Sequence, residues 1–384
     1  MTLKNWTFAS VCHQGVPTMR QKNLAFVVAS VAIASLGLIS VRAHAQTSPP
    51  ATQSAPPASE KPYDWKASFA KYPTGKVPRT PDGKPDLQGI WSRSILTPLQ
   101  RLAVQNKSEI SEAEARQAED IAQQESIELR VEPTATPPGE KTTDAYNSFW
   151  RDGYWYKVPM TSLHTSQVVD PPDGRVPPLT PAARARGQEA YERLNRPAIG
   201  PEDRPLSSRC VRPIGVGPPF TGSGPGGQAS TLQVVQSHDV VVVRPEAHES
   251  QMIYLDGRAR PPESIRLYKG VARGHWEGDT LVVDYTNFKD WGMEAFAAYG
   301  TTEKAHLTER WKRLDENHLL YGFTIEDPGT WTKPWSIEFV MWRLTDQEQL
   351  VEYACQEGNV GLEFTLSAAR AKEKEQEQEN GDHQ

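Results

Sequence analysis

From Thr231 onward, apolar and polar residues alternate along short segments that turn sequences separate. An alternation of period two is typical of strands that bury one face, and turns such as Asp256-Gly257 join neighbouring strands. The segments with this pattern are 232–236, 240–244, 251–255, 271–276, 280–285, 306–314, 319–326, 335–344 and 350–355. Parallel neighbours need long crossovers, so the short connections predict an antiparallel meander. A sheet of about nine strands closes or folds on itself, so we expect a mainly β protein with a barrel or a strongly curved sheet.

Helices are expected only at the periphery of this sheet. The chain has 384 residues with 32 prolines, and proline interrupts helix interiors, which argues against a helical bundle. A capping box of Ser111 and Glu114 predicts a helix over residues 108–129. A Thr-Pro pair beginning at Thr180 predicts a second helix over residues 180–195, because proline is favoured at the first helical position.

The changes in composition along the chain predict one domain with extensions at both ends. Residues 63–370 are expected to form a single β-rich domain that contains both helices and a Gly/Pro-rich loop at 210–226. Residues 46–62 are rich in Pro, Ser and Ala, which is typical of a flexible linker. Residues 371–384 are charged and lack apolar side chains, so they are expected to form a solvated tail.

Residues 1–45 have the parts of a secretory signal peptide: a positively charged start, the apolar run 24–41 and a small-x-small site that ends at Ala45. We expect cleavage after Ala45, with translation starting at Met19. The alternative is an uncleaved membrane anchor, because an apolar run of this length nearly spans a bilayer. Cleavage predicts a periplasmic or secreted protein without a membrane contact.

Only Cys210 and Cys355 remain once a leader of this length is removed. In an oxidising compartment such a pair is expected to form a disulfide, which would close a loop of about 145 residues. The alternative, a catalytic thiol, is less favoured because neither cysteine lies beside a helix start that would lower its pKa.

Two resemblances follow from short motifs. Gly89-Ile90-Trp91 before a meander is similar to the opening strand of lipocalins and their calycin relatives, in which the Trp closes one end of the barrel. The segments PDGKPDLQGIW, VVDPPDGRVPPLTPAA, GHWEGDTLVVDYTNF, HLTERWKRLD and YACQEGN resemble an uncharacterised family of secreted bacterial proteins. That resemblance implies secretion and a β-rich fold, and it implies no established activity. His164 stands where this family more often has Arg.

Several classes of function are disfavoured by what the sequence lacks. Asp+Glu number 48 against 42 Lys+Arg, whereas a nucleic-acid partner favours a basic surface. A GxGxxG after a strand and a GxxxxGK[ST] are both missing, so no nucleotide cofactor is expected. The spacings His-x-His, HExxH and Cys-x-x-Cys are missing too, so no metal is expected. Without a GxSxG elbow, an α/β-hydrolase is disfavoured.

The predicted strand 306–314 carries the first candidate site. His306 and Arg310 share one face, while Glu309 lies on the other beside Trp311. A histidine is a usable acid or base and an arginine is a constant donor for an anion, so these three are the candidate catalytic residues. If Glu309 faces an apolar interior, its pKa is expected to rise. A shielded ionisable group needs a partner. The candidate partners of His306 are Asp284, Tyr285 and Glu357. The alternative is a ladder of surface charges.

The predicted disulfide defines the second candidate site. It would bring Arg209 close to Glu357 and Asn359, which follow Cys355. These three are candidate ligand-binding residues; the alternative is an Arg209–Glu357 ion pair that braces the loop.

Aromatic residues supply the remaining candidates, Trp155 and Trp335. Core packing accounts for most aromatics, but rings at a barrel mouth suit a planar or sugar-like ligand.

The sequence therefore predicts a secreted or periplasmic protein that binds a small molecule of unidentified structure. The alternative is a cofactor-free acid–base enzyme, a hydrolase, lyase or isomerase, acting on a small aromatic or sugar-like compound. The lack of a catalytic motif favours binding.

Overall fold

The computed structural model describes residues 62–131, 158–210, 219–222, 230–246, 250–290, 301–345, 350 and 354–382. They all belong to one compact unit, Lys61–Gln384. The predicted leader and nearly all of the predicted linker lie outside the described residues, as does Trp155. Among the helices of the described ranges, none combines the length and the apolar character needed to cross a membrane.

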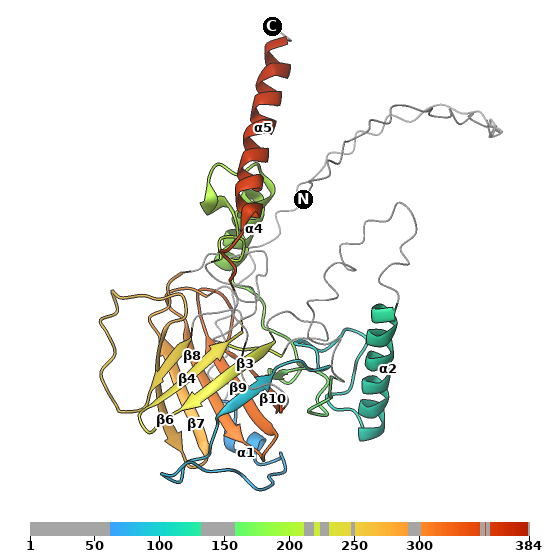
Figure 1. The fold of residues 1–384 in the computed structure, drawn as a ribbon, viewed down its shortest axis with the longest axis vertical. Coiled ribbons are helices and arrows are strands. Elements are labelled where there is room, and N and C mark those ends of the chain that lie inside the picture. The colour runs from blue at the N-terminus through green and yellow to red at the C-terminus, as the bar shows by residue number, and fades with distance from the viewer. Residues whose placement is uncertain are drawn as a thin grey trace, which may run out of the picture. The chain divides into compact units, whose positions relative to one another are not determined.

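A closed barrel is the centre of the fold (Figure 1). In spatial order its strands are β1 (Gly89–Ser92), β3 (Thr231–Gln236), β4 (Val240–Pro245), β5 (Gln251–Tyr254), β6 (Val271–Glu277), β7 (Thr280–Thr286), β8 (His306–Arg313), β9 (His318–Glu326) and β10 (Trp335–Arg343). Pairing of β1 with β10 closes the ring, and β2 (Val168–Asp170) adds a further strand beside β10. The predicted mainly β barrel is thus confirmed.

One pair of neighbours differs from the predicted antiparallel meander. β5 and β6 are parallel, with Tyr254 opposite Arg273, whereas the other neighbouring strands are antiparallel. The reason is the connection between them, residues 255–270, which is long enough for a crossover. The predicted strand 350–355 falls largely outside the described residues. The barrel contains one strand, β1, that lies before the nine segments with the alternating pattern.

Aromatic side chains fill the interior of the barrel. Every second residue of each strand points inward, and the largest fully buried side chains include the following: Trp91, Tyr285, Trp311, Tyr321, Phe323 and Phe339. The rings of Trp311 and Tyr321 meet edge to face with centroids 4.7 Å apart. Phe220 enters the same cluster from a loop. Each buried ring contributes about 2–3 kcal/mol by leaving water, so this cluster is the main core.

Local signals account for the two predicted helices. The helix α2 (Glu112–Val131) begins at the expected capping box: the Ser111 amide donates to Glu114 Oε2 at 2.7 Å, and the Glu114 amide donates to Ser111 Oγ at 3.3 Å. The helix α4 (Pro181–Asn195) begins after Thr180, whose hydroxyl accepts from the Ala183 amide at 3.1 Å.

Three further elements were not predicted at these bounds. They are the helix α1 (Trp65–Phe69), the 3-10 helix η2 (Pro201–Asp203) and the helix α5 (Val360–Asp382). α5 includes most of the predicted tail, and most of the side chains at 371–380 lie exposed along the helix. Among these elements, α1 packs against the outer face of the barrel.

The predicted disulfide is present. Cys210 and Cys355 are bonded, and their Cα atoms lie 5.6 Å apart. The bond joins the turn after η2 to the segment before α5, across a separation of 145 residues. Of the predicted loop 210–226, the structure describes Cys210 and residues 219–222.

Candidate functional site

The strand β8 presents opposite chemistry on its two faces. It lies between β7 and β9, so it is central in the sheet. His306 and Arg310 point outward, whereas Glu309 points into the barrel and is fully buried. The wall of the barrel therefore separates Glu309 from the other two candidate catalytic residues, because neighbouring residues of a strand face opposite ways.

The carboxylate of Glu309 is held inside the barrel by three donors. The hydroxyls of Tyr321 and Tyr285 donate to it at 2.7 Å and 2.9 Å, and the indole N–H of Trp311 donates at 3.2 Å. Burial raises the pKa of Glu309 to about 7, although these hydrogen bonds act in the opposite direction. The backbone amide of Phe220 donates to Tyr321 Oη at 3.0 Å and so extends the network. This carboxyl group is packed among side chains of the core.

On the outer face, His306 pairs with Asp284, one of its three candidate partners. The two groups are 3.4 Å apart, and the Thr308 hydroxyl also donates to Asp284 at 3.0 Å. Hydrogen bonding to His306 lowers the pKa of Asp284, although burial opposes the shift.

The pairing with a carboxylate does not distinguish His306 from the other histidines of the described residues. The other described histidines also lie beside carboxylates: His164 with Glu338, His238 with Asp239, His275 with Glu277 and His318 with Asp315. The side chain of His306 is 48% exposed, so the pair is a surface feature. An acid–base role for His306 remains a prediction.

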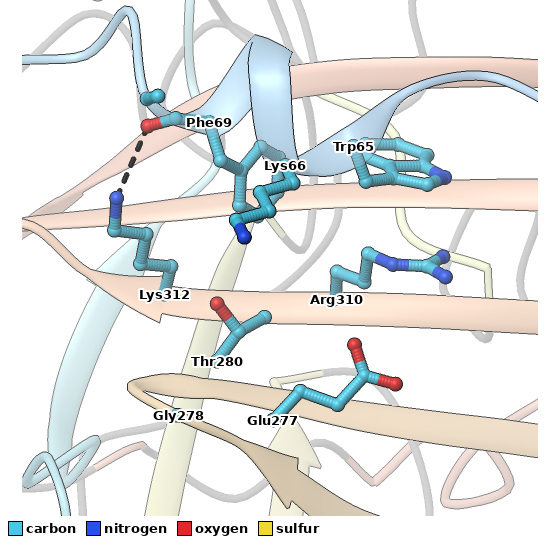
Figure 2. Close-up of a pocket in the computed structure, with 9 residues that line it drawn as sticks. Trp65, Lys66, Phe69, Glu277, Gly278, Thr280, Arg310 and Lys312 are labelled. Atoms are coloured by element: carbon cyan, nitrogen blue, oxygen red, sulfur yellow. Dashed lines mark hydrogen bonds between the residues drawn. The ribbon is translucent and has the colours of Figure 1, made fainter.

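Arg310 lines a pocket on the outer face of the barrel (Figure 2). The pocket has a volume of about 570 Å³, and its lining residues are Trp65, Lys66, Phe69, Ala70, Glu277, Gly278, Thr280, Arg310 and Lys312. α1 forms one wall, the hairpin of β6 and β7 forms the other, and β8 forms the floor.

The guanidinium group of Arg310 has an unusual environment within this pocket. It lies over the ring of Trp65, 5.0 Å from the ring centroid. Among the described residues, none forms a hydrogen bond or an ion pair with it. Burial lowers the pKa of Arg310, while the charges of Glu277 and Asp284 partly offset the shift. A half-buried guanidinium group without an acceptor retains its full capacity to donate hydrogen bonds to a ligand.

Two glycines allow the pocket to form. A Cβ atom at Gly322 would lie 2.3 Å from the ring of Trp65, so only glycine lets this ring rest on the sheet. The Trp65 indole then donates to Thr324 Oγ1 at 3.1 Å. On the opposite wall, Gly278 has φ +60° in the tight turn between β6 and β7, a conformation that favours glycine. The hairpin that this turn closes thus forms one side of the pocket.

A second polar cluster holds the α1 wall, and sequence reasoning missed it. Glu338 on β10 is 1% exposed and lies on the outer face of the barrel. Its carboxylate accepts from Ser68 Oγ at 2.7 Å and from the hydroxyls of Tyr72 and Tyr63 at 3.0 Å and 3.4 Å. His164 Nε2 lies 3.1 Å away. Burial raises the pKa of Glu338, but the hydrogen bonds, led by that of His164, have the larger effect. The pKa of Glu338 therefore lies below its usual value. The one signal in the sequence is a single acid within a mostly apolar strand.

The structure describes all three residues of the other candidate site, and their role in ligand binding remains a prediction. The amide of Asn359 donates to Ser208 O at 3.0 Å and to Cys210 Sγ at 3.3 Å, so the disulfide does bring it to this turn. Glu357 is exposed, and it forms no ion pair with Arg209, although the structure describes both.

Trp335 lies in the barrel core instead. It is 2% exposed, and its ring packs against Phe323 and Trp331 at centroid distances of 5.3 Å and 5.4 Å. The reason is its position at the inward-facing start of β10, opposite Ile325. Trp155, the remaining candidate, is outside the described residues.

Known proteins do not identify the site. Comparison of the chain with protein-family models, with curated proteins and with solved structures gives no match. In the described part of the chain, no group of three or more His, Cys, Asp or Glu residues is placed to hold a metal ion. The geometry of the pocket and of the Glu338 cluster is therefore the basis for a functional conclusion.

Proposed function

We propose that this protein binds a small anionic molecule in the pocket between α1 and the outer face of β7 and β8. The observation that carries the proposal is Arg310, which lines this pocket half-buried and without an acceptor in the described chain. An arginine in this state binds planar anions such as carboxylates through two parallel hydrogen bonds.

The other lining residues favour the same kind of ligand. Lys66 and Lys312 add two cations, whereas Glu277 is the single acid of the lining. Lys312 Nζ donates to Phe69 O at 3.1 Å, which holds its charge at the pocket. The volume of about 570 Å³ lies within the range of known small-molecule sites. Trp65 and Phe69 supply apolar surface, so the ligand we propose is an anion that carries an aromatic ring or another apolar part.

The proposed location is the periplasm or the outside of the cell. The Cys210–Cys355 disulfide supports it, because such bonds persist mainly in oxidising compartments. The signal-peptide pattern in residues 1–45 gives independent support.

The test is a titration by isothermal calorimetry with benzoate, inorganic phosphate and neutral benzamide. We expect saturable binding of benzoate or phosphate at one site and no binding of benzamide. Arg310→Gln should weaken anion binding at least tenfold, which corresponds to about 1.4 kcal/mol. Arg116→Gln is the matched control, because Arg116 is exposed on α2 and pairs with Glu112. Equal affinity in Arg310→Gln and the wild type would refute the assignment.

A second candidate function is the acid–base enzyme. The observation that favours it is that His306, oriented by Asp284, lies on the same face of β8 as Arg310. At about 3.4 Å per residue, their Cα atoms are about 14 Å apart, so Arg310 would hold the anion of an elongated substrate while His306 acts at its far end. Mass spectrometry of the ligand after incubation decides between the two functions. An altered ligand whose formation stops in His306→Gln, with binding retained, supports the enzyme.

A further inference from the structure

We propose that residues 63–72 form a strap that Glu338 holds on the barrel, so that Glu338 is a positioning residue for the anion pocket. This inference rests on the proposed function, because it assigns a residue to the same site. Glu338 does not line the pocket. It would act through the strap, which contains α1.

The strap carries one complete wall of the pocket. Trp65, Lys66 and Phe69 all come from it, and Figure 2 shows them facing Arg310 and Lys312 across the cavity. The barrel alone supplies the floor and the opposite wall. If the strap leaves the sheet, Arg310 loses the ring that it lies on and the cavity becomes an open surface.

The strap cannot hold its shape without tertiary contacts. Its only helix has five residues, and isolated helices of this length are unstable in water. The Asp64 carboxylate caps the helix by accepting from the Ala67 amide at 2.9 Å. Its apolar contacts form a small satellite cluster, separate from the barrel core, made of Trp65, Phe69, Leu314, Leu320 and Val340. Docking therefore depends on a limited apolar contact together with polar contacts.

Three polar contacts of the strap converge on one carboxylate, in addition to the hydrogen bonds Trp65–Thr324 and Lys312–Phe69. Two hydroxyls of the strap, those of Ser68 and Tyr72, donate to Glu338. The Tyr63 hydroxyl donates to Ser68 Oγ at 2.9 Å and makes a longer contact of 3.4 Å with Glu338. Hydrogen bonds to an ionised acceptor are stronger than neutral ones, and this acceptor is 1% exposed. Outside the strap, His164 supplies a further donor, and its Nδ1 lies 3.6 Å from the exposed carboxylate of Glu109. Glu338 thus links both ends of the strap and α1 to β10.

Loss of this carboxylate should weaken ligand binding without any change in the lining residues. A ligand that contacts both the strap and the barrel binds only when the strap is docked. Its apparent affinity therefore falls in proportion to the docked fraction. A merely structural role would lower the melting temperature and leave the affinity per folded molecule unchanged.

The experiment compares Glu338→Gln with Glu309→Gln in the full chain. Both variants replace a buried carboxylate by its amide, but Glu309 lies inside the barrel and contacts no residue of the strap. Hydrogen exchange of the strap amides is measured without ligand, and the affinity for benzoate and inorganic phosphate is measured per folded molecule. In Glu338→Gln we expect at least tenfold faster exchange in the strap, unchanged exchange in the barrel strands and at least tenfold weaker anion binding. Glu309→Gln should change neither the hydrogen exchange of the strap nor the affinity for the anions.

Each other result overturns the inference. Unchanged exchange in the strap of Glu338→Gln would show that Glu338 does not hold it. Faster exchange with unchanged affinity would remove Glu338 from the site, although the proposed function would stand. If neither anion binds the wild type, the proposed function is refuted, and this inference is refuted as well. Should Glu338→Gln not fold, the double variant Ser68→Ala with Tyr72→Phe removes two donors from the strap side, and the same two effects are expected.

Discussion

The substitution Glu309→Gln should change how the stability of the barrel depends on pH. The carboxyl group is fully buried, and the groups that face it are the hydroxyls of Tyr285 and Tyr321 and the indole of Trp311. Among the described residues, no Lys, Arg or His side chain is bonded to it. Burial penalises the ionised form by more than the three hydrogen bonds stabilise it, which is the reason its pKa rises from 4.5 to about 7.

The size and the sign of the effect follow from this shift. The native state binds the proton more tightly than the unfolded chain does, so protonation of Glu309 stabilises the fold. This contribution is fully present below pH 4.5 and is lost as the pH rises to about 7. At 1.36 kcal/mol for each pH unit, the total loss is about 3 kcal/mol. Such a loss is a large share of the stability of a typical domain.

The assay is urea unfolding of the wild type and of Glu309→Gln at several pH values between 5 and 8. Glutamine cannot ionise, so the free energy of unfolding of the wild type, minus that of the variant, should fall by about 2–3 kcal/mol over this range. Glu326→Gln is the matched control, because Glu326 is exposed at the end of β9. A difference between wild type and Glu309→Gln that stays constant across the range would refute the reasoning.

Three further predictions follow from other contacts. Cys355→Ser removes the disulfide and should lower the free energy of unfolding, measured in urea without reductant, by at most about 5 kcal/mol, which is the chain-entropy value for the loop that the disulfide closes. Cys210→Ser should cause the same loss, and unequal losses would argue against the bond. Gly322→Ala should displace the Trp65 ring, speed hydrogen exchange in the strap and lower stability by about 1–3 kcal/mol. The Cβ atom of the control Gly361→Ala in α5 would meet only Asn359 Oδ1, at an ordinary contact distance of 3.8 Å, and equal results for the two variants would contradict the close contact at Gly322. Glu277→Gln removes the single acid of the pocket lining and should tighten benzoate binding about two- to fivefold in calorimetry, and weaker binding would contradict an anion site.

The local patterns of the sequence determined the secondary structure and the sidedness of the strands. Period-two alternation and tight turns predict β3 to β10 at nearly their observed bounds, because side-chain direction alternates with every residue of a strand. The same rule separates Glu309 from His306 and Arg310 without any knowledge of the fold. Capping residues likewise predict α2 and the start of α4, because a cap acts within one turn of the chain. α2 begins at its capping box, four residues later than the predicted start at residue 108.

Tertiary structure alone decided where the proposed anion pocket forms. Which face of β8 points inward depends on the partner strands, and these put the aromatic core beside Glu309. The pocket at Arg310 and the cluster at Glu338 join residues that are far apart in the sequence, such as Ser68 and Glu338 at a separation of 270 residues. No local propensity encodes such contacts, because they arise from the packing of the strap on a closed barrel. The predicted ligand-binding role of Trp335 rested on the same kind of long-range assumption, and the packing of the barrel places this residue in the core instead.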